Sequence, residues 1–206
     1  MKKMKPLTKT IMEYAEKQPK GEVIRAKTLL HLGSRAAVDK ALSRLAEREK
    51  LLRVYRGFYV RLLEGRIGGR FLKYPPSPHL VVESIARTTG ESIAPNPAVT
   101  ANRLGLTTQN PIREIFITSG PSRWLKFGGS QLVEMRHTSR WQFNVGDKMS
   151  GRVLRAANWE GPERAAYALH KLRSELSPSY PDEMMAACPK LPAWLAREVR
   201  EFVANG

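Results

Sequence analysis

The stretch that decides the fold is Gly21–Val60, GEVIRAKTLLHLGSRAAVDKALSRLAEREKLLRVYRGFYV. From Val38 onward, apolar residues recur at positions i, i+3, i+4 and i+7, the spacing of the stripe that an amphipathic helix buries against a core. Ser34 lies just before this run and is a suitable N-cap, because its hydroxyl can accept a hydrogen bond from a free amide of the first turn. The pattern therefore predicts a helix that begins after Ser34 and leaves its opposite face exposed.

The segments on both sides of this helix complete a larger unit. Ala26–Leu32 is rich in leucine and stops at Gly33, which predicts a short preceding helix, with a short strand before it and a tight joint after it. After the second helix, Leu51–Tyr55 and Phe58–Leu62 alternate as strands do, and Arg56-Gly57 between them predicts a tight turn. Strand, helix, turn, helix and basic hairpin in this order indicate a winged helix-turn-helix.

A helix-turn-helix binds duplex DNA by placing the N-terminal part of its second helix in the major groove. Basic side chains on the exposed face of that helix and on the wing can reach base edges or phosphates. The competing interpretation is a solvated helix face followed by an ordinary charged hairpin. The candidate DNA-binding residues are Ser34, Arg35, Lys40, Ser43, Arg44, Arg53, Arg56 and Tyr59.

The charge of the chain also favours an anionic partner. Its formal net charge is +16 at pH 7, and residues 1–75 carry 19 lysines and arginines against 7 acidic residues. The excess positive charge is therefore +12 in this part and only +4 in the rest of the chain. Such clustering is typical of nucleic-acid-binding modules. A basic protein of the membrane surface is the competing class, but no long basic amphipathic helix is evident.

Other features of the composition favour a protein of the reducing cytoplasm. No run of about 18 apolar residues occurs, so we expect no membrane span and no membrane partner. The basic N-terminus lacks the apolar segment of a secretory signal, so we expect none. Cys188 is the single cysteine, which excludes an internal disulfide and a multi-cysteine metal site.

Glycine and proline clusters mark a domain boundary after the wing. Gly65–Arg70 is rich in glycine and Tyr74–Pro78 contains three prolines, a composition that interrupts regular structure. We predict a winged helix-turn-helix domain at residues 1–63, a linker at 64–78 and a C-terminal α+β domain at 79–206, with a small sheet followed by several helices. The other expected elements are helices at 9–18, 79–87 and 98–106, strands at 112–118, 124–127 and 131–137, and helices at 152–157, 163–176, 181–187 and 192–204.

The sequence offers little that is typical of an enzyme. The four histidines are scattered and form no His-x-x-x-His pair, so we expect no metal site. Gly65–Arg70 lacks the spacing of a Walker loop or of GxGxxG, and no Gly-x-Ser-x-Gly elbow occurs. Pro181-Asp182 with Glu134-Met135-Arg136 matches a restriction-type nuclease core in part only, because the order differs and Glu-x-Lys is absent. We therefore expect no catalytic residues and no cofactor.

Three runs of the sequence carry a family resemblance. They are LGSRAAVDKALSRLAEREKLLRVYRGFYV at 32–60, PNPAVTANRLGLTTQNP at 95–111 and REIFITSGPSRWLKFGG at 113–129. Together they closely resemble the AbiEi-like antitoxins of type IV toxin–antitoxin systems, and within them a bacterial branch with a domain of unknown function. The resemblance covers about residues 8–140.

The resemblance implies that the winged helix binds operator DNA and represses its own operon. It also implies that the C-terminal domain neutralises a co-encoded nucleotidyltransferase-like toxin of the AbiEii kind, by direct contact or indirectly. Winged-helix repressors often bind inverted repeats, so the chain is expected to act as a dimer or as paired monomers. The candidate residues for the antitoxic surface are Arg123, Arg136 and Arg140, which the predicted hairpin and its exit would expose to solvent.

Two other functions remain open from the sequence. One is a stand-alone transcriptional regulator with a C-terminal effector or partner domain and no toxin. The other is a nuclease that uses the winged helix for targeting. A toxin-like gene next door would favour the antitoxin over the stand-alone regulator, and the absence of metal-dependent cleavage would exclude the nuclease.

Overall fold

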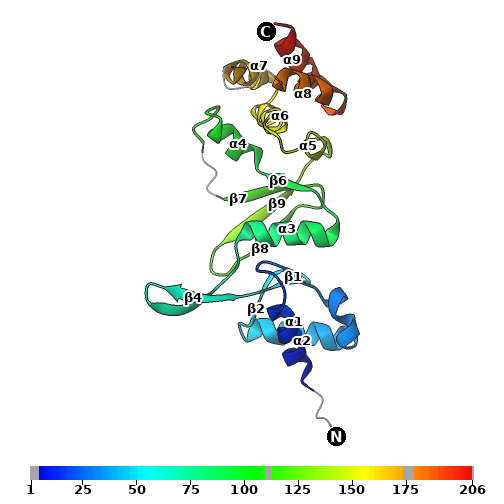
Figure 1. Ribbon diagram of the computed structural model, residues 1–206, viewed down its shortest axis with the longest axis vertical. Coiled ribbons are helices and arrows are strands. Elements are labelled where there is room, and N and C mark those ends of the chain that lie inside the picture. Colours follow the sequence, from blue (N-terminus) through cyan, green and yellow to red (C-terminus); the bar gives the residue numbers. More distant parts are fainter. Residues whose placement is uncertain (1–4, 110–112, 174–178, 206) are drawn as a thin grey trace. The chain divides into compact units, whose positions relative to one another are not determined.

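The computed structural model describes residues 5–109, 113–173 and 179–205, and it is a mixed α+β structure (Figure 1). The chain divides into two compact units. The N-terminal unit comprises Met1–Glu91 and Ser122–Met135, and the C-terminal unit comprises Ser92–Pro121 and Arg136–Gly206. The predicted fold class is confirmed.

Three helical segments build the core of the N-terminal unit: α1 (Leu7–Glu16), the 3₁₀ helix η1 (Ala26–Leu32) and α2 (Arg35–Glu47). The sequence pattern located α2 correctly, because Ser34 caps it and accepts a hydrogen bond from the Ala37 amide. The side chains that α2 buries are those of the predicted stripe, Val38, Ala41, Leu42 and Leu45. They pack in one hydrophobic cluster with buried residues of α1 and η1.

A three-stranded antiparallel sheet packs against these helices. It consists of β1 (Val23–Ile24), β2 (Leu51–Tyr55) and β3 (Phe58–Arg61), in the order β1-β3-β2. Gly57 lies in the turn between β2 and β3 with a φ of 80°, a left-handed conformation that glycine adopts without steric cost. The order of helices, turn and hairpin is compatible with a winged helix-turn-helix.

The segment predicted as a linker at 64–78 instead contains a second hairpin. Its strands are β4 (Leu63–Ile67) and β5 (Arg70–Tyr74), which pair antiparallel over their full length. Of the glycines that suggested a linker, Gly65 lies within β4, and Gly68 and Gly69 form a two-residue turn in which both have positive φ. Only the prolines that follow Tyr74 interrupt regular structure.

The N-terminal unit also extends beyond the predicted boundary at residue 63. Helix α3 (Pro78–Thr89) packs on β1, where the buried Ser84 hydroxyl accepts a hydrogen bond of 2.9 Å from the Val23 amide. Arg87 of α3 forms an ion pair with Glu22. Strands β8 (Arg123–Lys126) and β9 (Leu132–His137) form a further antiparallel hairpin. Its strand β8 contacts β2. The boundaries of the two compact units therefore differ from those of the predicted domains.

The C-terminal unit is mainly helical. Strand β6 (Ile93–Pro95) pairs antiparallel with β7 (Glu114–Thr118). The helices are α4 (Pro97–Arg103), α5 (Trp141–Asn144), α6 (Met149–Glu160), α7 (Pro162–Lys171), α8 (Tyr180–Ala187), η3 (Cys188–Lys190) and α9 (Ala193–Ala204). The short elements β6, α5 and η3 were not predicted. Residue 112 of the expected strand and residues 174–176 of the expected helix 163–176 lie outside the described residues.

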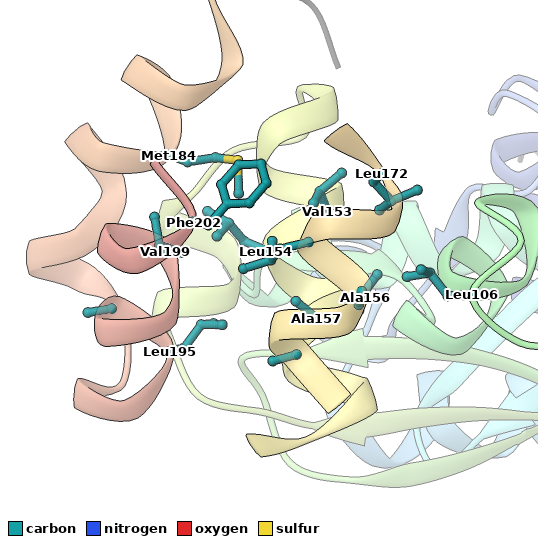
Figure 2. Close-up of a cluster of buried hydrophobic side chains, with 14 of the residues drawn as sticks. Leu106, Val153, Leu154, Ala156, Ala157, Leu172, Met184, Leu195, Val199 and Phe202 are labelled. Atoms are coloured by element: carbon teal, nitrogen blue, oxygen red, sulfur yellow. The ribbon is translucent and has the colours of Figure 1, made fainter. Parts of the chain in front are cut away.

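Helix α6 organises the core of this unit. It contacts α4, α7 and α8, and its Val153 and Leu154 are fully buried. Figure 2 shows these side chains in one cluster with Met184 of α8 and Phe202 of α9. Cys188 is buried in the same cluster, so the single thiol is part of the packing.

Candidate nucleic-acid interface

The exposed face of α2 carries the predicted helix residues. Arg35, Lys40 and Arg44 are exposed, Ser43 is half-buried and the capping Ser34 is exposed. Because the apolar stripe of α2 faces the core, these side chains lie on the remaining surface of the helix, which faces solvent. Lys40 and Arg44 lie close together on this exposed surface, whereas Arg35, in the first turn, lies about half a turn around the helix from Arg44.

Arg35 has a partner on the same helix. Its Nε donates a hydrogen bond of 2.8 Å to Oδ2 of Asp39, and both side chains are largely exposed. An exposed pair of this kind stabilises a helix by only about 0.3–0.5 kcal/mol. Arg35 can therefore exchange the carboxylate for a phosphate or a base edge at little cost. In the described part of the chain, no carboxylate lies within ion-pair distance of Lys40 or Arg44.

The wing presents two cations and not the predicted tyrosine. Arg53 and Arg56 are exposed, with Arg56 at the turn beside Gly57. Tyr59 is only 5% exposed and belongs to the core of the N-terminal unit, so the prediction of an exposed Tyr59 on the DNA-facing wing is wrong. The reason is that β3 is the middle strand, and Phe58, Tyr59 and Val60 are all buried on it.

Two arginines at or near the wing make cation–π contacts with aromatic rings of β3. The Arg53 guanidinium carbon lies 5.9 Å from the centre of the Tyr59 ring, and that of Arg25 lies 4.6 Å from the centre of the Phe58 ring. Arg25 directly precedes η1 and was not among the predicted residues. Its charge was the only signal in the sequence, because a stacking partner 33 positions away cannot be read from local spacing.

The three predicted antitoxic residues do not form one exposed group. Arg123 is only 8% exposed, and its guanidinium pairs with both carboxylate oxygens of Glu91 while Nε contacts Sδ of Met135 at 3.3 Å. The prediction that the hairpin exposes Arg123 is therefore wrong, because this side chain points to the buried face of β8. Arg136 and Arg140 are exposed.

The described residues offer few features typical of a catalytic or metal site. Among them, no group of three or more His, Cys, Asp or Glu side chains could hold a metal ion. A cavity of about 250 Å³ lies at the base of the β4–β5 hairpin and is lined by both acidic and basic side chains. Its lining residues are Met12, Glu16, Glu49, Lys50, Arg61, Leu62, Glu64 and Lys73. None of the helices in the described ranges is long and apolar enough to cross a membrane.

Most of the chain matches a known protein family. A family of unknown function, DUF6088, matches residues 10–173. The chain belongs to DUF6088. The match includes all of α2, the wing and the β4–β5 hairpin, so these features of the DUF6088 chain lie within the family's shared region. No curated protein and no solved structure matches the chain.

Proposed function

We propose that this DUF6088 protein binds duplex DNA through α2 and the wing. The observation that carries the proposal is the orientation of α2, which buries its apolar stripe and presents Arg35, Lys40 and Arg44 to solvent. The start of this helix is the part that enters the major groove in helix-turn-helix proteins. The charge of +12 on residues 1–75 supports an anionic partner.

Arg35 and the wing arginines have different roles in this proposal. Arg35 lies in the first turn of α2 and contacts a base edge, a contact that carries sequence information. Arg53 and Arg56 lie on the wing and contact phosphates, which hold the protein on the duplex without reading its sequence.

We further propose that the DNA is the operator of the protein's own operon and that the protein is an antitoxin. The support is the resemblance of residues 8–140 to AbiEi-like antitoxins. In this proposal the C-terminal unit neutralises a nucleotidyltransferase-like toxin, directly or indirectly, and the protein binds DNA as a dimer or as paired monomers. Arg136 and Arg140 are the exposed candidates for the antitoxic surface.

The DNA-binding proposal is tested by titrating the protein against the duplex upstream of its own gene and against a scrambled duplex, at several salt concentrations. Arg35→Ala is expected to weaken binding to the operator by about 1–3 kcal/mol and to reduce the preference over the scrambled duplex. Arg56→Ala should weaken binding to both duplexes alike and lower the salt slope by about 0.9.

Arg200→Ala is the matched control, because it removes an exposed arginine from α9 of the C-terminal unit. If the unmodified protein binds both duplexes equally, the operator proposal is wrong although the charge attracts DNA. If Arg35→Ala and Arg56→Ala both bind normally, the assigned face is wrong. The antitoxin proposal is tested separately, by co-expression with the product of a neighbouring toxin-like gene and measurement of growth.

A further inference from the structure

The hairpin β4–β5 projects as an arm that little else covers. Residues 68–73 are all exposed, and so are Glu64 and Arg66. Phe71 is 77% exposed and Leu72 is 46% exposed, although hairpin strands usually bury one face. We refer to residues 63–74 as the arm. In the described part of the chain, its main packing is between its own two strands.

The charges of the arm are arranged along its length. At its foot, Lys73 Nζ lies 3.9 Å from Oε1 of Glu64, its cross-strand neighbour. Nearer the tip, Arg66 and Arg70 have no carboxylate partner among the described residues. The end of the arm therefore presents two uncompensated guanidinium groups.

An exposed aromatic ring accompanies these cations. The Arg66 guanidinium carbon lies 5.2 Å from the centre of the Phe71 ring, and Arg66 and Phe71 are cross-strand neighbours. Arg70 directly precedes Phe71 in β5, so it belongs to the opposite face of the hairpin. The two arginines thus lie on the two faces of a thin ribbon.

The tip of the arm is slender. Gly68 and Gly69 form the turn with φ values of 57° and 82°, and, apart from the adjacent residues of the chain, no described residue has an atom within 4 Å of a Cβ placed on either glycine. A two-residue glycine turn adds no side-chain width to the end of the ribbon. Such a tip suits a narrow groove like the minor groove of B-DNA, about 6 Å wide.

We propose that the arm is a second DNA-binding element that enters the minor groove of the duplex held by α2 and the wing. Arg66 and Arg70 contact the phosphates on the two walls of the groove, and Phe71 contacts sugars and base edges. Apolar side chains on extended arms commonly contact base steps in the minor groove. This inference rests on the proposed DNA binding by α2 and the wing.

Two observations favour DNA over a protein partner. The arm carries three cations against one carboxylate, which complements a phosphate backbone. It also continues directly from the wing, because β3 ends at Arg61 and β4 begins at Leu63. A single residue therefore connects the wing strand to the arm.

The test compares three variants in operator titrations and in hydroxyl-radical footprinting. The double variant Arg66→Gln/Arg70→Gln should lower the salt slope by about 1.8, because two phosphate contacts are lost. It should also lose the minor-groove protection at the edge of the footprint and keep the protection given by α2. Phe71→Ala should weaken binding severalfold without changing the salt slope, because its contact is not ionic. Arg197→Gln/Arg200→Gln removes the same charge from α9 and should leave the slope and the footprint unchanged.

The outcomes separate this inference from the proposed function. If the unmodified protein binds no duplex, the proposed function fails and the arm proposal fails with it. If it binds the operator while both arm variants keep its affinity, salt slope and footprint, only the arm proposal is overturned. If Phe71→Ala changes the oligomeric state in sedimentation and leaves DNA binding intact, the arm contacts a second copy of the chain, and the proposal is wrong. Circular dichroism of each variant checks that it is folded.

Discussion

Arg123 shows how the environment of one residue decides its role. It was predicted to be exposed on a hairpin, but it lies on the buried face of β8 and pairs with Glu91 of the same unit. Only 5% of the Arg123 side chain and 11% of the Glu91 side chain are exposed. Burying a charge without a partner costs several kcal/mol, so each member of this pair allows the other to be buried within the N-terminal unit.

Removing one member of this pair should therefore destabilise the fold. We expect Arg123→Ala to lower the free energy of unfolding by about 3–5 kcal/mol, because it leaves the Glu91 carboxylate buried without its main cation. Urea denaturation followed by circular dichroism measures the change. The exposed Arg140→Ala should stay within about 0.5 kcal/mol of the unmodified protein. Equal stability of the two variants would show that the buried pair contributes nothing.

At the scale of elements, α2 was predicted correctly because several local signals agreed. The cap at Ser34 and the spacing from Val38 both depend on neighbours within a few residues, which a sequence displays directly. For the same reason, Arg35, Lys40 and Arg44 could be assigned to the exposed face. The strands β2 and β3 and the turn at Gly57 followed from equally local patterns.

The predictions failed where long-range packing decides the outcome. The burial of Tyr59 follows from the central position of β3 between β1 and β2, and β1 lies more than 30 positions away in the sequence. The β4–β5 hairpin was missed for another reason. Its Gly68-Gly69 turn is a good hairpin signal, but the nearby Gly65 and the prolines after Tyr74 are equally typical of a linker.

The cap of α2 can be tested as an element. Ser34→Ala should lower the free energy of unfolding by about 1 kcal/mol, because the Ala37 amide loses its hydrogen-bond acceptor. Ser43→Ala changes the same residue type in the interior of α2 and should be neutral or slightly stabilising, because alanine has the higher helix propensity. Thermal unfolding of both variants gives the comparison. A larger loss for Ser43→Ala would contradict the assigned helix start.

At the scale of the whole molecule, acid should weaken both units. The hydrogen bond from Lys5 lowers the pKa of Glu13 in the N-terminal unit. In the C-terminal unit, hydrogen bonds from Arg152 lower the pKa of Asp147, and those from Ser150 and Lys148 lower the pKa of Glu183. A carboxylate with a lowered folded-state pKa stabilises the fold above its unfolded pKa, near 4, and this stabilisation is lost as the pH falls through the folded pKa.

Asp147 is the carboxylate to vary. Besides Arg152 it holds Arg155, which is only 3% exposed and whose Nη2 lies 3.0 Å from Oδ1 of Asp147. Asp147→Asn should lower the free energy of unfolding at pH 7 by about 1–2 kcal/mol, since a charged hydrogen-bond acceptor is lost. The difference from the unmodified protein should shrink as the pH falls below about 4, because Asp147 is protonated first in the unfolded chain and only at lower pH in the folded protein, where its pKa is lowered. Denaturation at pH 7 and pH 3 measures both, and a constant difference would contradict the expectation.

The buried Cys188 is a natural probe of local unfolding in the C-terminal unit. Burial raises the pKa of this thiol, so both its thiolate fraction and its access to reagents are low in the folded state. Since the N-terminal unit contains no cysteine, the rate at which a thiol reagent modifies the native chain reports only on transient opening of the C-terminal unit. Comparing that rate with and without a bound partner would show whether the partner slows the transient opening of this unit. The measurement needs no engineered cysteine.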